Sequence, residues 1–143
     1  MVSPATIHYR RVAGDYGDAT SNDFKDFWGL HLWGEAIAPS EATLWEKPKP
    51  FASLDEFGVF WSIDVIDDTK PLLFIIHRGD QKDPTGSGDR SFFPNAYPEV
   101  WINSEDMTIY PSLNAANGVP EPSTLALLGL GIAGLAAARR RKQ

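Results

Sequence analysis

The sequence contains no cysteine. That absence excludes disulfide bridges, thiolate zinc sites, iron–sulfur clusters and cysteine nucleophiles. Basic residues are also scarce, because the 143 residues hold 13 Lys and Arg against 19 Asp and Glu, a formal net charge of −6. A chain this acidic lacks the phosphate-neutralising surface through which proteins bind nucleic acid. We therefore expect no nucleic-acid partner.

Signatures of catalysis are missing as well. The chain is too short for a complete glycosidase barrel, which needs about 250 residues, and it carries no nucleophile elbow, P-loop or zinc-protease motif. Its three histidines are scattered singly, and the adjacent acids Asp67 and Asp68 are typical of a turn rather than of a glycosidase acid and base. The spacing of Asp80, Asp83 and Asp89 does not fit an EF-hand. We expect a chain that is not an enzyme, with no cofactor and no metal site.

Aromatic residues, in contrast, are plentiful. They make up 12% of the chain and include five tryptophans, while hydrophobic residues make up 43%. This composition is sufficient for a globular fold. Five large rings exceed what the core of one small domain needs, so we expect some of them to face a ligand.

The last 25 residues differ in composition from the rest. From Val119 onward four basic residues stand against one acid, a net charge of +3, whereas the preceding 118 residues carry nine basic and 18 acidic groups, a net charge of −9. Residues 125–138 hold no charge and precede the basic end Arg139–Lys142. A terminal helix packed on the domain is one interpretation, but the stretch is rich in glycine and lacks an amphipathic pattern. A short apolar helix followed by basic residues is typical of a membrane stop sequence, so we expect a C-terminal hydrophobic, transmembrane-like helix.

This tail resembles a known sorting signal. The stretch VPEPSTLALLGLGIAGLAAARRRKQ resembles the PEP-CTERM signal in its tripeptide Pro120-Glu121-Pro122, its short apolar segment and its arginine cluster. The resemblance implies processing by an exosortase-type enzyme and export through the inner membrane of a Gram-negative bacterium, to the cell surface or extracellular matrix. The start, MVSPATIHYRR, has no signal-peptide pattern, so we expect a misplaced start, a fragment or another export route.

The rest of the chain has the pattern of strands. Alternation is clear over residues 57–66, where five apolar side chains share one face, and Leu72–Arg78 is a nearly continuous apolar run, typical of a strand covered on both sides. No helical period of useful length precedes the tail, and the segments between the apolar runs are rich in turn residues. The pattern predicts an all-β sandwich with strands near residues 6–12, 27–33, 57–66, 72–78, 98–103 and 107–110.

One predicted strand carries aromatic residues on its outer face. Along residues 28–33, period 2 directs a tryptophan and two leucines to the core, and Gly29, His31 and Trp33 to the other side. Two neighbouring planar rings on an exposed face suit a sugar chain, because the C–H faces of glucosyl rings are apolar and their rims are hydroxyls. In the alternative interpretation Trp33 closes the edge of the sandwich and His31 is an ordinary surface residue.

A polar loop follows the apolar run at residues 79–90. Lys82 offers N–H donors, and Asp83 and Asp89 offer carboxylate acceptors. A lysine beside an aspartate can hold a pair of sugar hydroxyls through charge-assisted hydrogen bonds. A solvated hairpin loop and a calcium loop are the alternatives for this segment.

Several separated motifs resemble one family. They are TIHYRRVAGDYGD, FWGLHLWGEA, FGVFWSIDV, FIIHRGDQKDP, GDRSF and EVWI, and together they cover about residues 5–111. In order and spacing they are similar to the pullulanase-associated starch-binding module, carbohydrate-binding module family 41. The resemblance implies an immunoglobulin-like β-sandwich that binds α-1,4-linked glucans such as starch, glycogen and pullulan, and that usually precedes a larger catalytic region.

The resemblance also implies site residues. His31 and Trp33 match the two stacking aromatics of the family, Lys82 matches its lysine, and Asp89 matches its aspartate. Asp83 is a further candidate for the acidic role, because the spacing of the loop can differ by an insertion.

These observations predict three segments. We expect an α-glucan-binding β-sandwich at residues 1–111, a linker at 112–118 and a sorting and membrane segment at 119–143. The expected function is non-catalytic binding of an α-glucan polysaccharide or maltooligosaccharide by an exported protein. The alternatives are an accessory fragment of a pullulanase-type hydrolase and a structural β-sandwich of the extracellular matrix.

Overall fold

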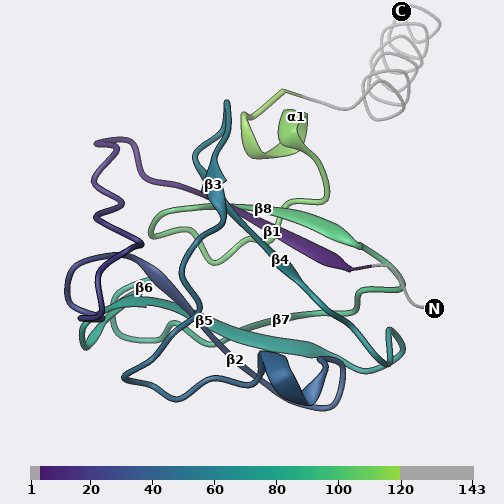
Figure 1. Ribbon diagram of the computed structural model, residues 1–143. Coiled ribbons are helices and arrows are strands. Elements are labelled where there is room, and N and C mark those ends of the chain that lie inside the picture. Colours follow the sequence, from purple (N-terminus) through teal and green to yellow (C-terminus); the bar gives the residue numbers. More distant parts are fainter. Residues whose placement is uncertain (1–3, 120–143) are drawn as a thin grey trace, which may run out of the picture.

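The computed structural model describes residues 4–119, which form two β-sheets packed face to face (Figure 1). In the first sheet the strand order is β3 (Ser53–Leu54), β4 (Val59–Ile63), β1 (Ala5–Arg10) and β8 (Glu99–Asn103). In the second sheet β5 pairs with three strands: β2 (Gly29–Trp33), β6 (Gln81–Asp83) and β7 (Arg90–Phe92), with β5 itself spanning Leu72–Arg78. All of these pairs are antiparallel except β1 with β8, which is parallel. The expected all-β fold is confirmed.

The core lies between the two sheets and follows the alternation of the sequence. Ile7 and Tyr9 on β1 and Leu30 and Leu32 on β2 are fully buried. Four of the five apolar residues of the alternating stretch at 57–66 also face the core: Val59, Trp61, Ile63 and Val65. Phe57, which precedes β4, is buried outside this core, against His8 and Arg10. Because successive side chains of a strand point to opposite faces, the residues between these core positions are left on the outer faces.

The structure also differs from the predicted strands. Residues 107–110 form no strand and contribute one bridge, from Tyr110 to Trp101. Three strands that the sequence did not indicate, β3, β6 and β7, are only two or three residues long. A strand this short contains too few residues to produce a recognisable period, so its position depends on the partner strand.

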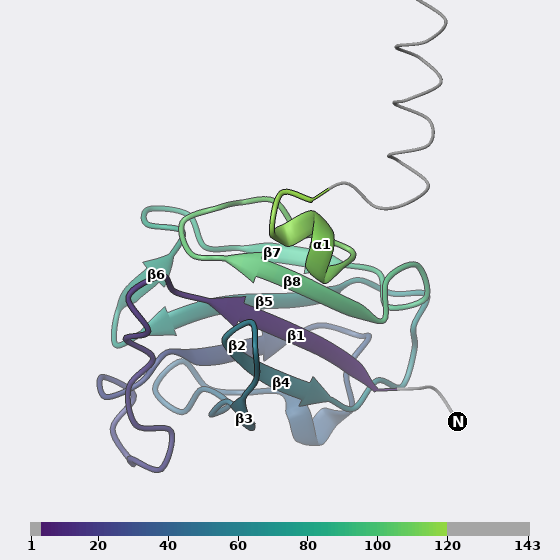
Figure 2. The same cartoon turned by 90° about the horizontal axis from the view of Figure 1, so that it is seen from above.

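One turn of helix follows the last strand. The helix α1 (Leu113–Ala116) is capped by the preceding residue, Ser112, whose hydroxyl accepts a hydrogen bond from the Ala115 N–H at 3.0 Å. Asn103 of β8 donates a hydrogen bond to the Ala116 carbonyl at 2.9 Å, and Figure 2 shows α1 beside β8. The expected linker at 112–118 is therefore in contact with the first sheet through Ala116.

The sorting segment lies outside the described residues. The expected transmembrane-like helix and the tripeptide Pro120-Glu121-Pro122 belong to it. Within residues 4–119, no helix has the length and apolar character needed to cross a membrane.

Candidate functional site

The outer face of the second sheet carries a hollow of about 510 Å³, which we call the platform hollow. Four of the five site residues predicted from the sequence line it, and two further residues join them. The lining residues are His31, Trp33, Trp45, Ile75, Lys82 and Asp89.

Strands β2 and β5 form the floor of the platform hollow. His31 of β2 lies opposite Ile75 of β5, and both point away from the core. The rings of His31 and Trp33 lie two residues apart on the same face, with centroids 5.2 Å apart and planes inclined at 32°. The predicted alternation therefore places an imidazole, an indole and an aliphatic side chain on one surface.

Trp45 forms a wall of the platform hollow that the sequence did not reveal. It lies on a turn closed by a hydrogen bond from the Lys47 N–H to the Leu44 carbonyl at 3.0 Å. Its ring stacks on His77 of β5, with centroids 3.7 Å apart and planes at 6°, and lies nearly perpendicular to His31 at 79°. No periodicity marks this turn, and the surplus of tryptophans is the one sequence signal that could have pointed to it.

A hydrogen bond orients the Trp45 ring. Its indole Nε1 donates to Asp80 Oδ1 at 3.0 Å. Asp80 is the second residue after β5, so the Trp45 turn is held against the end of the strand that supplies part of the floor. The wall is thus fixed at two points, by His77 beneath the ring and by Asp80 at its edge.

Burial favours the neutral form of the two histidines on this face. Burial lowers the pKa of His77, and burial also lowers the pKa of His31. His77 Nδ1 donates to the Gly79 carbonyl at 2.8 Å, while its buried Nε2 has no hydrogen-bond partner among the residues that the structure describes. His31 Nδ1 lies 2.7 Å from the hydroxyl of Thr43, which also accepts the Leu32 N–H at 2.9 Å. Two uncharged rings thus pack beside tryptophan without the cost of burying a charge.

Lys82 and Asp89 supply the polar rim of the platform hollow. Lys82 of β6 lies opposite His77, and its Nζ is 5.9 Å from the centroid of the Trp45 ring. Asp89 is exposed on the loop just before β7. Neither side chain has a hydrogen bond or an ion pair within residues 4–119. Three ammonium donors and a carboxylate acceptor are therefore free to bind a ligand.

Asp83 occupies a different place from the one expected. It is fully buried, and its carboxylate accepts hydrogen bonds from the hydroxyls of Tyr9 and Ser104, the latter at 2.6 Å. The Glu105 N–H donates to it at 2.8 Å, and Arg90 Nη2 lies 3.4 Å away. This carboxylate does not line the platform hollow, because it is enclosed by protein partners that already satisfy it.

The buried residues Asp83 and Arg90 nevertheless lie next to the two rim residues in the chain. Along β6, Lys82 points outward and Asp83 inward, and along the entry to β7, Asp89 is exposed and Arg90 is buried. Arg90 also donates to the backbone carbonyl of Asp83 at 2.8 Å. Asp83 and Arg90, which form this buried pair, are thus the direct sequence neighbours of the two rim residues, Lys82 and Asp89.

Comparison with known proteins gives two family matches and a set of related folds. The bacterial pullanase-associated domain matches residues 3–111, and the PEP-CTERM protein-sorting motif matches residues 118–142. An alpha-amylase of Streptomyces lividans is 34% identical over 79 residues, which are 55% of this chain and 7% of the amylase.

Solved structures share the fold at low sequence identity. A Klebsiella pneumoniae pullulanase complexed with maltotriose aligns with 78% of this chain and 11% of its own, at 18% identity and a TM-score of 0.58. A structure of family 41 carbohydrate-binding modules from streptococcal virulence factors aligns with 78% of this chain and 48% of its own, at 15% identity and a TM-score of 0.58. The chain thus spans less than half the length of each of these proteins.

Proposed function

The chain belongs to the family of bacterial pullulanase-associated domains, and from this membership and the platform hollow we propose that it is a non-catalytic module that binds α-1,4-linked glucans. The observation that carries the proposal is the grouping of His31, Trp33 and Trp45 around one hollow whose rim holds the unpaired Lys82 and Asp89.

The shape of the hollow favours an α-linked chain. His31 and Trp33 are inclined at 32°, and Trp45 stands at 79° to His31, so the three rings do not lie in one plane. The apolar faces of glucosyl rings pack on such rings, while polar groups at the edge orient the sugar. A surface of mutually inclined rings suits a curved α-glucan better than it suits a flat, β-linked chain.

The rim would then bind hydroxyls. The Lys82 ammonium donates to a hydroxyl oxygen, and the Asp89 carboxylate accepts from a hydroxyl hydrogen. Such charge-assisted bonds are stronger than neutral ones. Stacking thus supplies the contact area, and the rim fixes the orientation of the sugar.

The related proteins support this proposal. One of the similar structures is described as α-glucan recognition by family 41 modules, and another holds maltotriose in a pullulanase. This chain aligns with only 7% of the amylase and 11% of the pullulanase, which agrees with a binding module rather than a catalytic unit.

The sorting motif extends the proposal to the cell envelope. Because residues 118–142 match the PEP-CTERM motif, we infer that the chain is exported, processed by an exosortase-type enzyme and delivered to the cell surface or matrix. The α-glucan would be bound there.

Retention on insoluble polysaccharide tests the binding function. The full-length chain should be retained on granular starch and released by soluble maltooligosaccharides, but it should pass through microcrystalline cellulose. Equal retention on both polymers would show non-specific adhesion, and no retention on starch would overturn the proposal.

A further inference from the structure

A second hollow lies beyond the Trp45 turn. It measures about 410 Å³, and we call it the side hollow. Its floor is apolar, formed by Phe24, Phe27 and Pro48, and its rim is polar. Its volume falls within the range of small-ligand sites, about 300–1,000 Å³.

The side hollow and the platform hollow are related through the turn at residues 44–47. A shallow depression of about 300 Å³ is lined by residues 44–47. It shares Trp45 with the platform hollow, and it shares Glu46 and Lys47 with the side hollow. The three hollows therefore adjoin one another around this turn, and together we call them the track.

An aromatic series runs beneath this track. The Phe24 ring contacts His77 edge to face with centroids 6.1 Å apart, and His77 stacks on Trp45 at 3.7 Å. Trp45 in turn lies 5.4 Å from His31. Rings thus continue from the platform to the floor of the side hollow without interruption.

The rim of the side hollow is free to bind. Within the part of the chain that the structure describes, the side chains of Asn22, Glu46 and Lys47 have no hydrogen bond and no ion pair. They combine an amide, a carboxylate and an ammonium, so their charges cancel. Mixed donors and acceptors of zero net charge around an apolar floor suit a neutral polyhydroxylated ligand better than a phosphate or a charged peptide.

We propose that the side hollow is a second subsite for the same α-glucan chain and takes the glucosyl units that extend past Trp45. The proposal deepens the function proposed above and rests on it. Its consequence is length selectivity: a short oligosaccharide fills the platform hollow, and a longer one also reaches the side hollow.

Calorimetric titration of the full-length chain with maltotriose and with maltoheptaose tests this selectivity. We expect maltoheptaose to bind about 10-fold more tightly, and the variants Asn22→Ala and Glu46→Ala to lose most of that gain. Their affinity for maltotriose should remain within about twofold of the unsubstituted chain. The statistical gain from sliding a longer chain along one site is the same in every variant, so the variants isolate the side hollow.

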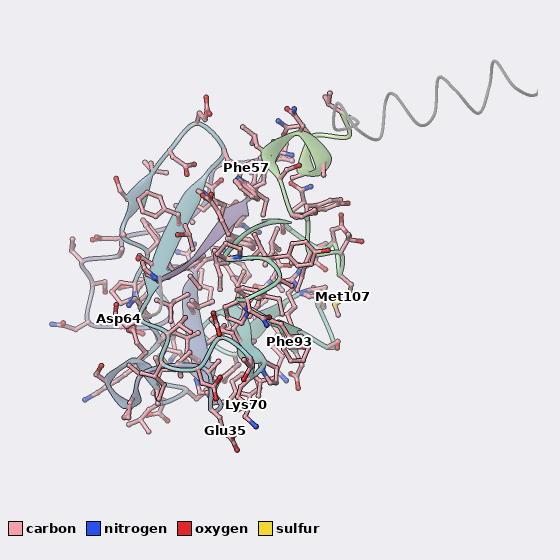
Figure 3. The ribbon with its side chains drawn as sticks, turned by 90° about the vertical axis from the view of Figure 1, so that its right-hand side faces the viewer. Glu35, Phe57, Asp64, Lys70, Phe93 and Met107 are labelled. Atoms are coloured by element: carbon pink, nitrogen blue, oxygen red, sulfur yellow. The ribbon has the colours of Figure 1, made fainter. Side chains whose placement is uncertain are left out.

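Phe24→Ala removes part of the floor and should act in the same direction. Because Phe24 also contacts His77, the affinity of Phe24→Ala for maltotriose must be measured as well. That measurement shows whether the substitution has also changed the platform hollow. The matched controls are Glu56→Ala, on the exposed turn between β3 and β4, and Phe93→Ala, where the side chain is 50% exposed after β7 (Figure 3). Both controls should bind the two sugars as the unsubstituted chain does.

The outcomes separate the two proposals. If both sugars bind with equal affinity, the side hollow is no subsite and the platform function stands. Equal losses for both sugars in Asn22→Ala and Glu46→Ala would mean that these residues act through the platform, which also overturns the inference. If no maltooligosaccharide binds at all, the proposed function itself fails.

Discussion

At the scale of the residue, the five tryptophans divide according to the surface on which they lie. Trp28 and Trp61 are in the core, at 2% and 0% exposure. Trp33 and Trp45 line the platform hollow, and Trp101 lies on the outer face of the first sheet. One residue type thus stabilises the fold at two positions and offers a stacking surface at two others, because the strand face or turn on which each ring lies decides what it contacts.

Replacing Trp33 tests the stacking surface. Trp33→Ala should weaken starch binding by about 30-fold, since losing one stacking ring at the centre of a site costs about 2 kcal/mol or more. The fold should remain intact because the ring is outside the core. Binding isotherms on granular starch would measure the loss, and circular dichroism would check the fold.

Trp101→Ala is the matched control. Trp101 is also partly buried, but it lies on the first sheet, where its ring stacks on that of His8 with centroids 4.8 Å apart. Its loss should leave starch binding unchanged. Wild-type binding by a folded Trp33→Ala protein would remove Trp33 from the site.

The polar rim makes a separate prediction. Lys82→Ala and Asp89→Ala should each weaken maltooligosaccharide binding by about 1–3 kcal/mol, because a charge-assisted bond is lost. Neither should lower the free energy of unfolding, since both side chains lie unpaired at the surface. In a double-mutant cycle, coupling indicates that both hold one sugar, and additivity indicates different sugars. If both rim variants keep the affinity of the unsubstituted chain while Trp33→Ala loses it, stacking alone accounts for the affinity.

His77 predicts a pH dependence of stability. Burial lowers its pKa in the folded state below the ordinary value of 6.5. The unfolded chain therefore binds more protons, and the free energy of unfolding should fall as the pH drops below about 6.5, by at most about 1.4 kcal/mol per pH unit for this group. Asp80, Lys82 and His31 are the charged or titratable groups that act on it.

Urea titrations between pH 7.5 and 5 would measure this slope. His77→Asn keeps a donor for the Gly79 carbonyl but does not titrate, so its slope should be shallower. Acids such as Asp15 and Asp106 have pKa values lowered from the ordinary 3.8. Their contribution to the free energy of unfolding is therefore lost only at a pH below this window. An identical slope in His77→Asn would exclude His77 as the cause.

At the scale of the element, one buried cluster joins the two sheets beside the site. Asp83 of β6 accepts hydrogen bonds from Tyr9 of β1 and from Ser104, which follows β8. Burial and the nearby Asp83 carboxylate raise the pKa of Tyr9, so its hydroxyl remains a donor. Short strands such as β6 and β7 have few backbone hydrogen bonds of their own, and this cluster ties them to the first sheet.

Removing Asp83 should therefore damage stability. Asp83→Ala leaves the Arg90 guanidinium, 3% exposed, without its carboxylate. Breaking a buried pair in this way typically costs about 3–5 kcal/mol. Chemical denaturation would measure the loss, and Asp89→Ala is the matched control because its carboxylate is exposed. An Asp83→Ala protein with unchanged stability and lost sugar binding would instead assign Asp83 to the site.

At the scale of the whole molecule, the chain combines an acidic body with an oppositely charged end. Residues 1–118 carry a net charge of −9 and the last 25 residues +3. The acidic body has the platform hollow on its second sheet, while α1, which leads to the sorting motif, lies beside β8 of the first sheet (Figure 1). The proposed binding surface and the sorting motif thus belong to different parts of the molecule.

The sorting motif predicts a processed protein. We expect cleavage near Pro120-Glu121-Pro122, because the PEP-CTERM motif covers residues 118–142. The intact mass of the protein recovered from the envelope or medium of an expressing host with an exosortase should lack the last residues. A chain that still ends at Gln143 in the cytoplasmic fraction of such a host would contradict export.

The sequence by itself determined the features that depend on local geometry. Alternation with period 2 is a property of any strand, so the core faces of residues 5–10, 29–33 and 59–63 could be read without a structure, as could the outward position of His31 and Trp33. Composition likewise identified the apolar, basic-ended tail.

Only the tertiary structure decided the features that depend on distant partners. Trp45 becomes a wall because His77 and Asp80, more than 30 residues later, hold its ring. Asp83 and Asp89 look equivalent in the sequence, yet one is enclosed by Tyr9 and Ser104 and the other faces solvent. Burial of a carboxylate depends on partners that the folded chain brings from other strands, and no local pattern records which acid will meet them.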